Sequence, residues 1–296
     1  MNTPNFFIVG APKCGTTAMD RYLAEHPEIF MCPRKECHYF GSDLRIAYDR
    51  PTEAEYRAYF DEADDARRIG ESSVCYLVSE RAAEEIAAFS PDAKIVIMLR
   101  NPVDMMVSLH SQLCHNAEET VTDFEAALAE EADRRAGKFD SLPTPRIPQA
   151  FCYRHMARYP QQVKRYYEVF GPDNVHVIIF DDLKANTPGV YRDVLEFLGV
   201  DPTFAPTFER INANTSARWP RLQQLILASP FGRSYRLRRM IPGVLRRMIS
   251  GLNSKVHERA PMAPALRRAL TDEFAPVVSE LSDLLKRDLT HWSRER

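Results

Sequence analysis

The chain has 296 residues, of which 45% are hydrophobic and 27% charged, with a formal net charge of −2 and a mean hydropathy of −0.37. This composition is typical of a soluble globular protein, and no apolar run approaches the roughly 20 residues that a membrane-spanning helix needs. The first residues carry neither a basic leader nor a cleavable apolar region, which predicts a cytoplasmic protein. The six cysteines form no C-x-x-C pair, so neither a zinc site nor a disulfide framework is predicted.

The chain begins with a predicted strand, a loop and a helix. Phe6–Val9 is an apolar, strand-like run. A helix is expected over about residues 16–26, closed by Pro27, because its apolar residues fall on one face. This order of elements is that of a phosphate-binding loop.

The loop itself, GAPKCGTT, departs from the usual pattern G-x-x-x-x-G-K-[ST]. Gly10 and Gly15 have the right spacing, but Thr16 follows Gly15 and the lysine lies inside the loop as Lys13. The backbone amides of the loop and the positive end of the helix would hold an anion. Lys13 adds a point charge, and Thr16 and Thr17 add hydroxyl donors.

The middle of the chain alternates between apolar runs and amphipathic segments. KECHYF (35–40) and ESSVCYL (71–77) are expected as loops or short extended pieces near one edge of the fold. A helix is expected around 81–89. The continuous apolar run KIVIMLR (94–100) is typical of a buried parallel strand. The Asn-Pro that follows supplies a cap and a first residue for the next helix.

A basic residue, Arg100, ends this second strand. A loop that hydrolyses a triphosphate needs a magnesium ligand, generally an Asp at the end of a neighbouring strand. Arginine at this place suits direct, metal-free recognition of a second phosphate. Ser108 would lie two turns into the next helix, so that Arg100 and Ser108 could converge on one phosphate. No metal site is predicted.

The second half of the chain continues the alternation of strands and helices. We expect helices at about 121–136, 154–169 and 189–198, a Pro- and Gly-rich loop after the first, a buried strand in NVHVIIFDDL, and a glycine stop at Gly199. Together the elements predict an α/β, three-layer P-loop-like fold with a central parallel sheet. We expect residues 1–296 to form a single domain, with about 218–296 as a basic, helical C-terminal cap.

Two acidic residues, Asp181 and Asp182, end the third predicted strand and leave an alternative function open. They could hold the metal of a magnesium-dependent P-loop kinase. The favoured interpretation is that they cap the helix that follows.

FFIVGAPKCGTTAMDRYLAEHPEIFMCPRKECHYF together with KIVIMLRNPVDMMVSLHSQL resembles the sulfotransferases that use 3′-phosphoadenosine 5′-phosphosulfate (PAPS). The likeness is closer to the heparan-sulfate-type and bacterial branch than to the cytosolic phenol and steroid enzymes. It covers nearly the whole chain, except about 114–150 and 230–265. It implies transfer of a sulfuryl group from PAPS to a hydroxyl, less readily an amine, of a carbohydrate, lipid or secondary metabolite, with no metal required.

The resemblance also assigns residues to the donor site. The family's 5′-phosphosulfate loop is matched by Lys13, Gly15, Thr16 and Thr17, with Cys14 inside it, and its 3′-phosphate site by Arg100 and Ser108. Arg218 and Arg221 fall where relatives carry a basic loop that closes over the nucleotide. FAPVVSELSDLLKRDLTHW resembles the family's C-terminal helix.

The acceptor needs a base, and two candidates lie together in RKECHYF. The resemblance places the base at Glu36, with Lys35 nearby, whereas the ordinary pKa of histidine also suits His38. A sulfuryl group carries less charge than a phosphoryl group, so Lys13 could stabilise the leaving oxygen directly. The segment Glu71–Ser73 could touch the acceptor, orient Lys13 or serve hydrogen bonding in the core.

The segment 218–268 is strongly basic, with twelve Lys or Arg and one acid. Within it, residues 233–250 have apolar side chains at helical spacing, which predicts either a helical lid or a peripheral membrane contact. Nucleic-acid binding is not expected, because no aromatic-rich platform accompanies the charge. A non-catalytic nucleotide-binding protein is a further alternative, which Glu36 and His38 argue against. The acceptor and the oligomeric state stay open.

Overall fold

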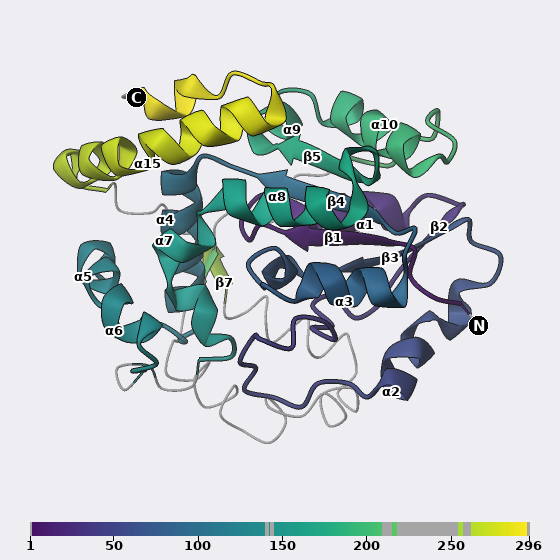
Figure 1. The fold of residues 1–296 in the computed structure, drawn as a ribbon, viewed down its shortest axis with the longest axis horizontal. Helices are drawn as coiled ribbons and strands as arrows, with labels where there is room; N and C mark the ends of the chain where they lie inside the picture. Colours follow the sequence, from purple (N-terminus) through teal and green to yellow (C-terminus); the bar gives the residue numbers. More distant parts are fainter. Residues whose placement is uncertain are drawn as a thin grey trace.

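The computed structural model describes residues 2–139, 142, 145–208, 215–217, 254–256 and 262–294. Its centre is a five-stranded sheet of order β2-β3-β1-β4-β5, in which every pairing is parallel (Figure 1). The strands are β1 (Phe6–Gly10), β2 (Ile29–Met31), β3 (Arg68–Ser72), β4 (Lys94–Leu99) and β5 (Val175–Ile179). The expected α/β fold with a central parallel sheet is therefore confirmed.

Helices cover both faces of the sheet, as right-handed crossovers between parallel strands require. Helix α1 (Thr16–Ala24) lies behind the sheet in Figure 1, and α3 (Ala82–Phe89) and α8 (Tyr159–Phe170) lie side by side in front of it. With both faces covered, β1 is buried along its whole length. Its continuous apolar sequence follows from that burial.

The remaining helices surround this core. They are α2 (Glu53–Arg57), α4 (Pro102–His115), α5 (Phe124–Ala129), α6 (Glu131–Arg135), α7 (Tyr153–Met156), α9 (Phe180–Ala185), α10 (Thr187–Leu198) and α15 (Pro264–Leu285). The side chain of Asn101 caps α4 by accepting from the amides of Val103 and Asp104, as predicted. Gly199 ends α10 in the left-handed conformation, also as predicted. Among the helices in the described ranges, none is both long and apolar enough to cross a membrane.

Several expected elements differ in extent. The helix expected over 121–136 is divided into α5 and α6, and the one over 154–169 into α7 and α8. The segment ESSVCYL contributes the end of β3, an interior strand, before a 3-10 turn at Val74–Tyr76. The short strand β2 was not predicted. Most of the predicted cap, including 233–250, lies outside the described residues, but α15 confirms its C-terminal helix.

Glu71 is a carboxylic acid in the interior of the sheet. It lies on β3 opposite Phe7 of β1 and is fully buried. Its carboxylate accepts hydrogen bonds from the hydroxyls of Ser73 and Tyr56. Burial raises the pKa of Glu71 to about 7, because an ionised carboxylate is poorly solvated there.

This raised pKa predicts a pH dependence of stability. Between the ordinary pKa of about 4.5 and the folded value of about 7 the native state holds a proton that unfolding releases. The free energy of unfolding should therefore fall as pH rises through that window, by on the order of 3 kcal/mol. Glu71→Gln, which imitates the protonated acid, should remove most of this slope in urea denaturation at pH 4.5 to 7.5. Glu84→Gln, at an exposed position of α3, is the matched control, and curves for wild type and Glu71→Gln that run parallel would contradict the prediction.

Candidate active site

The loop between β1 and α1 holds its shape through two glycines and a contact with β4. Gly10 and Gly15 have φ angles of 146° and 92°, which side chains rarely allow. A Cβ on Gly15 would lie 2.8 Å from Leu183 of α9, so the loop touches that helix directly. The amide of Ala11 donates to the carbonyl of Met98 at 2.7 Å. The first amides of α1 follow Gly15, and such amides have no partner within their own helix, which makes them anion donors.

Arg100 reaches this loop from the end of β4. Its Nη1 donates to the carbonyl oxygen of Lys13 at 3.5 Å, and its guanidinium carbon lies 5.0 Å from the ring centre of Phe180. The Nε of Arg100 is buried and has no hydrogen-bond partner in the part of the chain that the structure describes. The structure thus places the guanidinium of Arg100 against the backbone of the loop that carries Lys13. Ser108 is buried on α4.

The side chains of the loop differ in what they can offer a ligand. The thiol of Cys14 is fully buried and donates to the carbonyl of Pro12 at 3.3 Å. Burial raises the pKa of Cys14 to about 12, so the group stays a thiol and only its backbone amide suits an anion. Thr16 is buried at the start of α1, and Thr17 is half-buried.

The second segment of the site, residues 34–38, is attached to the end of β3. The amide of Glu36 donates to the carbonyl of Ser72 at 2.9 Å, and its carboxylate accepts from the amide of Val74 at 3.0 Å. Lys35 lies with its Nζ 3.6 Å from the Glu36 carboxylate and donates to the Ser72 hydroxyl. Glu36 has a φ of 63°, so these bonds hold a backbone conformation that a non-glycine residue rarely adopts.

Glu36 and His38 lie beside each other but differ in access. The Nε2 of His38 is 3.6 Å from the Glu36 carboxylate, and the side chain of His38 is 4% exposed against 32% for Glu36. Burial is the main cause that lowers the pKa of His38, so the imidazole is neutral near pH 7. Its Nδ1 is buried and has no partner among the described residues. Of the two predicted bases, Glu36 is the one that an acceptor can approach.

The segment Glu71–Ser73 serves hydrogen bonding beneath the site. Ser72 accepts from Lys35, and the Ser73 hydroxyl accepts from the amide of His38 at 3.2 Å and donates to Glu71. Sequence reasoning missed Asp20, which follows Thr16 by one turn of α1. Burial raises the pKa of Asp20, with Lys35 opposing that effect and Glu36 adding to it, so its carboxyl is close to both residues. The spacing of four residues from Thr16 was the signal that could have found it.

Asp181 and Asp182 both lie in the first turn of α9. The residue at the N-cap position itself is Ile179, which has no capping side chain. The carboxylate of Asp181 accepts from the indole Nε1 of Trp292 at 2.6 Å, and that of Asp182 accepts from both terminal nitrogens of Arg287. Residues near the C-terminus thus pair with both carboxylates, and the place of the two acids in the first turn of α9 agrees with the favoured interpretation that they stabilise the start of that helix.

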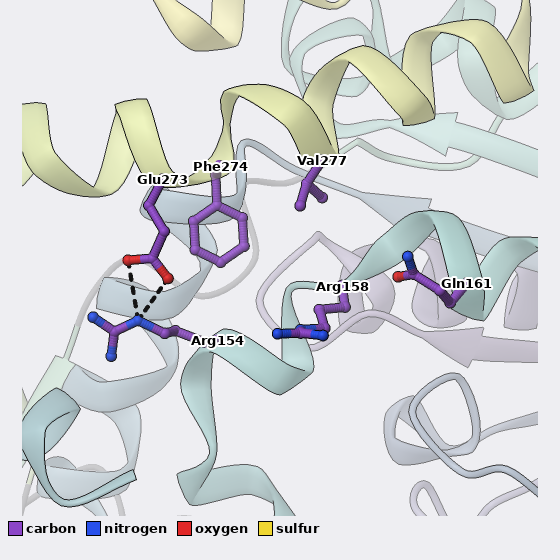
Figure 2. Close-up of a pocket in the computed structure, with 6 residues that line it drawn as sticks. All are labelled: Arg154, Arg158, Gln161, Glu273, Phe274 and Val277. Carbon is purple, nitrogen blue, oxygen red and sulfur yellow. Dashed lines mark hydrogen bonds and ion pairs between the residues drawn. The ribbon is translucent and has the colours of Figure 1, made fainter. Parts of the chain in front are cut away.

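Other parts of the chain contribute less to the site. Arg218 and Arg221 lie outside the described residues. A cavity of about 160 Å³ lies between α7, α8 and α15 and contains none of the predicted site residues (Figure 2). Arg154 pairs with Glu273 across it, with an Nε to Oε1 distance of 2.8 Å. In this region α15 packs against α7 and α8. The candidate site lies elsewhere, at the loop after β1.

Solved structures of known proteins share this fold. A sulfotransferase from Alicyclobacillus acidocaldarius is 32% identical, with a TM-score of 0.74, and the match covers 99% of this chain and all of that one. The sulfotransferase domain of the curacin biosynthetic pathway shares the fold, with a TM-score of 0.50 at 14% identity, over 98% of this chain and 100% of that domain.

Curated relatives match over shorter stretches. The membrane-associated sulfotransferase kil1 of Dictyostelium discoideum is 31% identical over 44% of this chain and 28% of its own length. Heparan sulfate glucosamine 3-O-sulfotransferase 6 of Mus musculus is 33% identical over 37% of this chain and 30% of its own length. The matched region thus spans about a third or less of these relatives.

A family model described as "Sulfotransferase domain" matches residues 3–221, which include the loop after β1, the segment around Glu36, and Arg100. The match therefore includes the three segments that make up the candidate site. The chain belongs to the sulfotransferase family.

Proposed function

We propose that this protein transfers a sulfuryl group from PAPS to a hydroxyl group of an acceptor, without a metal ion. The observation that carries the proposal is the approach of the Arg100 guanidinium to the backbone carbonyl of Lys13, which places a cation against a phosphate-type loop. The buried Nε of Arg100, which has no partner within the described ranges, is a donor that an anion would satisfy. These features fit a nucleotide with separate 5′- and 3′-phosphate groups.

Each residue has a role in this proposal. The loop amides and Lys13 would hold the 5′ end of the donor, and Arg100, with Ser108, its 3′-phosphate. When bound, PAPS supplies an activated sulfuryl group. Lys13 would stabilise the charge that develops on the leaving oxygen, because a cation beside that oxygen favours the transition state.

Glu36 is the proposed base that takes the proton of the acceptor hydroxyl. Its carboxylate is the more accessible of the two candidates and is held by the amide of Val74, so its oxygens have a defined position. The neutral His38 supports it from the buried side. The acceptor class is proposed as carbohydrate, by analogy with the name of the heparan sulfate relatives; lipids and secondary metabolites are the other acceptors to test.

Donor binding should be independent of metal and dependent on Arg100. We expect the product nucleotide PAP to bind in the presence of EDTA, and Arg100→Gln to weaken binding about 10- to 100-fold, since charged hydrogen bonds are worth about 1.5–3 kcal/mol. Isothermal titration calorimetry measures both. Arg158→Gln, an arginine of the cavity in Figure 2, is the matched control and should leave the affinity unchanged. Preference for ATP with magnesium over PAP would overturn the proposal in favour of a kinase.

The base assignment is tested by turnover. Glu36→Gln should retain PAP binding and lose about 10²- to 10⁴-fold in turnover of PAPS, the range expected for removal of a general base. Sulfated product is measured by its mass shift against a panel of sugars, lipids and small hydroxyl compounds. His38→Asn is the comparison: a larger loss there than in Glu36→Gln would move the role of base to His38. Near-normal turnover in Glu36→Gln would refute its role.

A further inference from the structure

We propose that three residues near the C-terminus, Arg287, His291 and Trp292, position Arg100 and so set the affinity of the donor site. We call them the C-terminal latch. The inference rests on the proposed function, because the quantity it concerns is the binding of PAP. It assigns a role in nucleotide binding to residues about 190 positions away from Arg100 in the chain.

Trp292 joins two elements that flank the donor site. Its side chain is buried, and its indole Nε1 donates to Asp181 of α9 at 2.6 Å. Its carbonyl oxygen accepts from the side-chain amide of Asn101 at 3.0 Å. The side-chain oxygen of Asn101 accepts from the backbone amides of Val103 and Asp104 and so caps α4. Trp292 therefore restrains the residue that directly follows Arg100.

The second connection runs through α9. Phe180 precedes Asp181, and its ring lies under the guanidinium of Arg100. The same ring would be 3.3 Å from a Cβ on Gly15, so α9 supports both the arginine and the phosphate loop. The C-terminal latch holds the first turn of this helix in place, because Arg287 pairs with Asp182 and His291 lies 3.3 Å from Asp181.

Arg100 depends on such support because it has few bonds to the residues that the structure describes. Among these residues, its guanidinium makes the 3.5 Å bond to the carbonyl of Lys13 and lies against the Phe180 ring. A long side chain with so weak a hydrogen bond gains fixed geometry only from the surfaces around it. If Asn101 and Phe180 shift, Arg100 loses its fixed position. The binding of PAP then includes the entropic cost of ordering the Arg100 side chain.

The chain offers a matched control on α15, the helix that precedes the latch. Glu273 of α15 pairs with Arg154, a contact of the same kind as that between Arg287 and Asp182 (Figure 2). It fastens α15 to α7 at the cavity described above and involves neither α9 nor Asn101. Loss of this ion pair would loosen α15 without disturbing the support of Arg100.

The experiment is a double-mutant cycle read by calorimetric PAP affinity. Trp292→Phe, which removes the indole N–H and keeps an aromatic ring, should raise the Kd for PAP about tenfold, whereas Glu273→Gln should stay within about twofold of wild type. In steady-state turnover, Trp292→Phe should raise the KM for PAPS with little change in kcat. If Trp292 acts through Arg100, the double variant with Arg100→Gln should bind no more weakly than Arg100→Gln alone.

Arg287→Gln, at an exposed position, gives a second measurement if Trp292→Phe does not fold, and should raise the Kd about threefold. Additive effects in the cycle, or an unchanged Kd in a folded Trp292→Phe, would overturn the role of the latch while leaving the proposed function intact. Failure of the wild-type protein to bind PAP would overturn the proposed function and the latch together.

Discussion

The candidate site depends on the contact between the phosphate loop and α9. Gly15 comes so close to this helix that even a methyl group would overlap Leu183, and the left-handed backbone at that position favours glycine for a second reason. The ring of Phe180 lies at the same place and also underlies Arg100. One short helix thus sets the separation between the loop that follows β1 and the arginine that follows β4. Because parallel strands end at the same edge of a sheet, the loop and the arginine can share this support.

The acceptor side of the site depends on β3. Glu36 is bound through its amide to Ser72 and through its carboxylate to Val74, so the proposed base takes its position from the end of an interior strand. β3 itself lies next to β1, the strand that leads into the phosphate loop. The distance between proposed base and proposed donor loop is therefore fixed by the hydrogen-bonded pairing of two neighbouring strands. Such a pairing leaves little freedom for the two halves of the site to move apart.

The sequence predicts those features whose evidence lies within a few neighbouring residues, and it misses those that depend on distant parts of the chain. β1, β4 and the cap of α4 were predicted because their evidence lies within a few residues: apolar runs, an Asn and a Pro. β3 was not recognised as an interior strand, since Arg68–Ser72 has Ile69 as its one large apolar residue. Position 70 is a glycine because the ring of Phe6 would overlap any side chain there. The next residue, Glu71, is a buried acid, which is also atypical of an interior strand. The partners of Asp181 and Asp182 lie more than a hundred residues away, so no local pattern could separate capping from contacts with the C-terminus.

Charge is divided across the site in a way that suits the proposed chemistry. Lys13 and Arg100 stand on the donor side, where an anionic nucleotide gains from them, and Glu36 and Asp20 stand beside the segment that carries the proposed base. Lys35 lies 3.6 Å from the Glu36 carboxylate and donates to the hydroxyl of Ser72, so the proposed base has a cation beside it at the end of β3. A general base must lie within hydrogen-bond reach of the proton that it accepts. The contacts of Glu36 with Val74 and Lys35 give its carboxylate a defined position for that role.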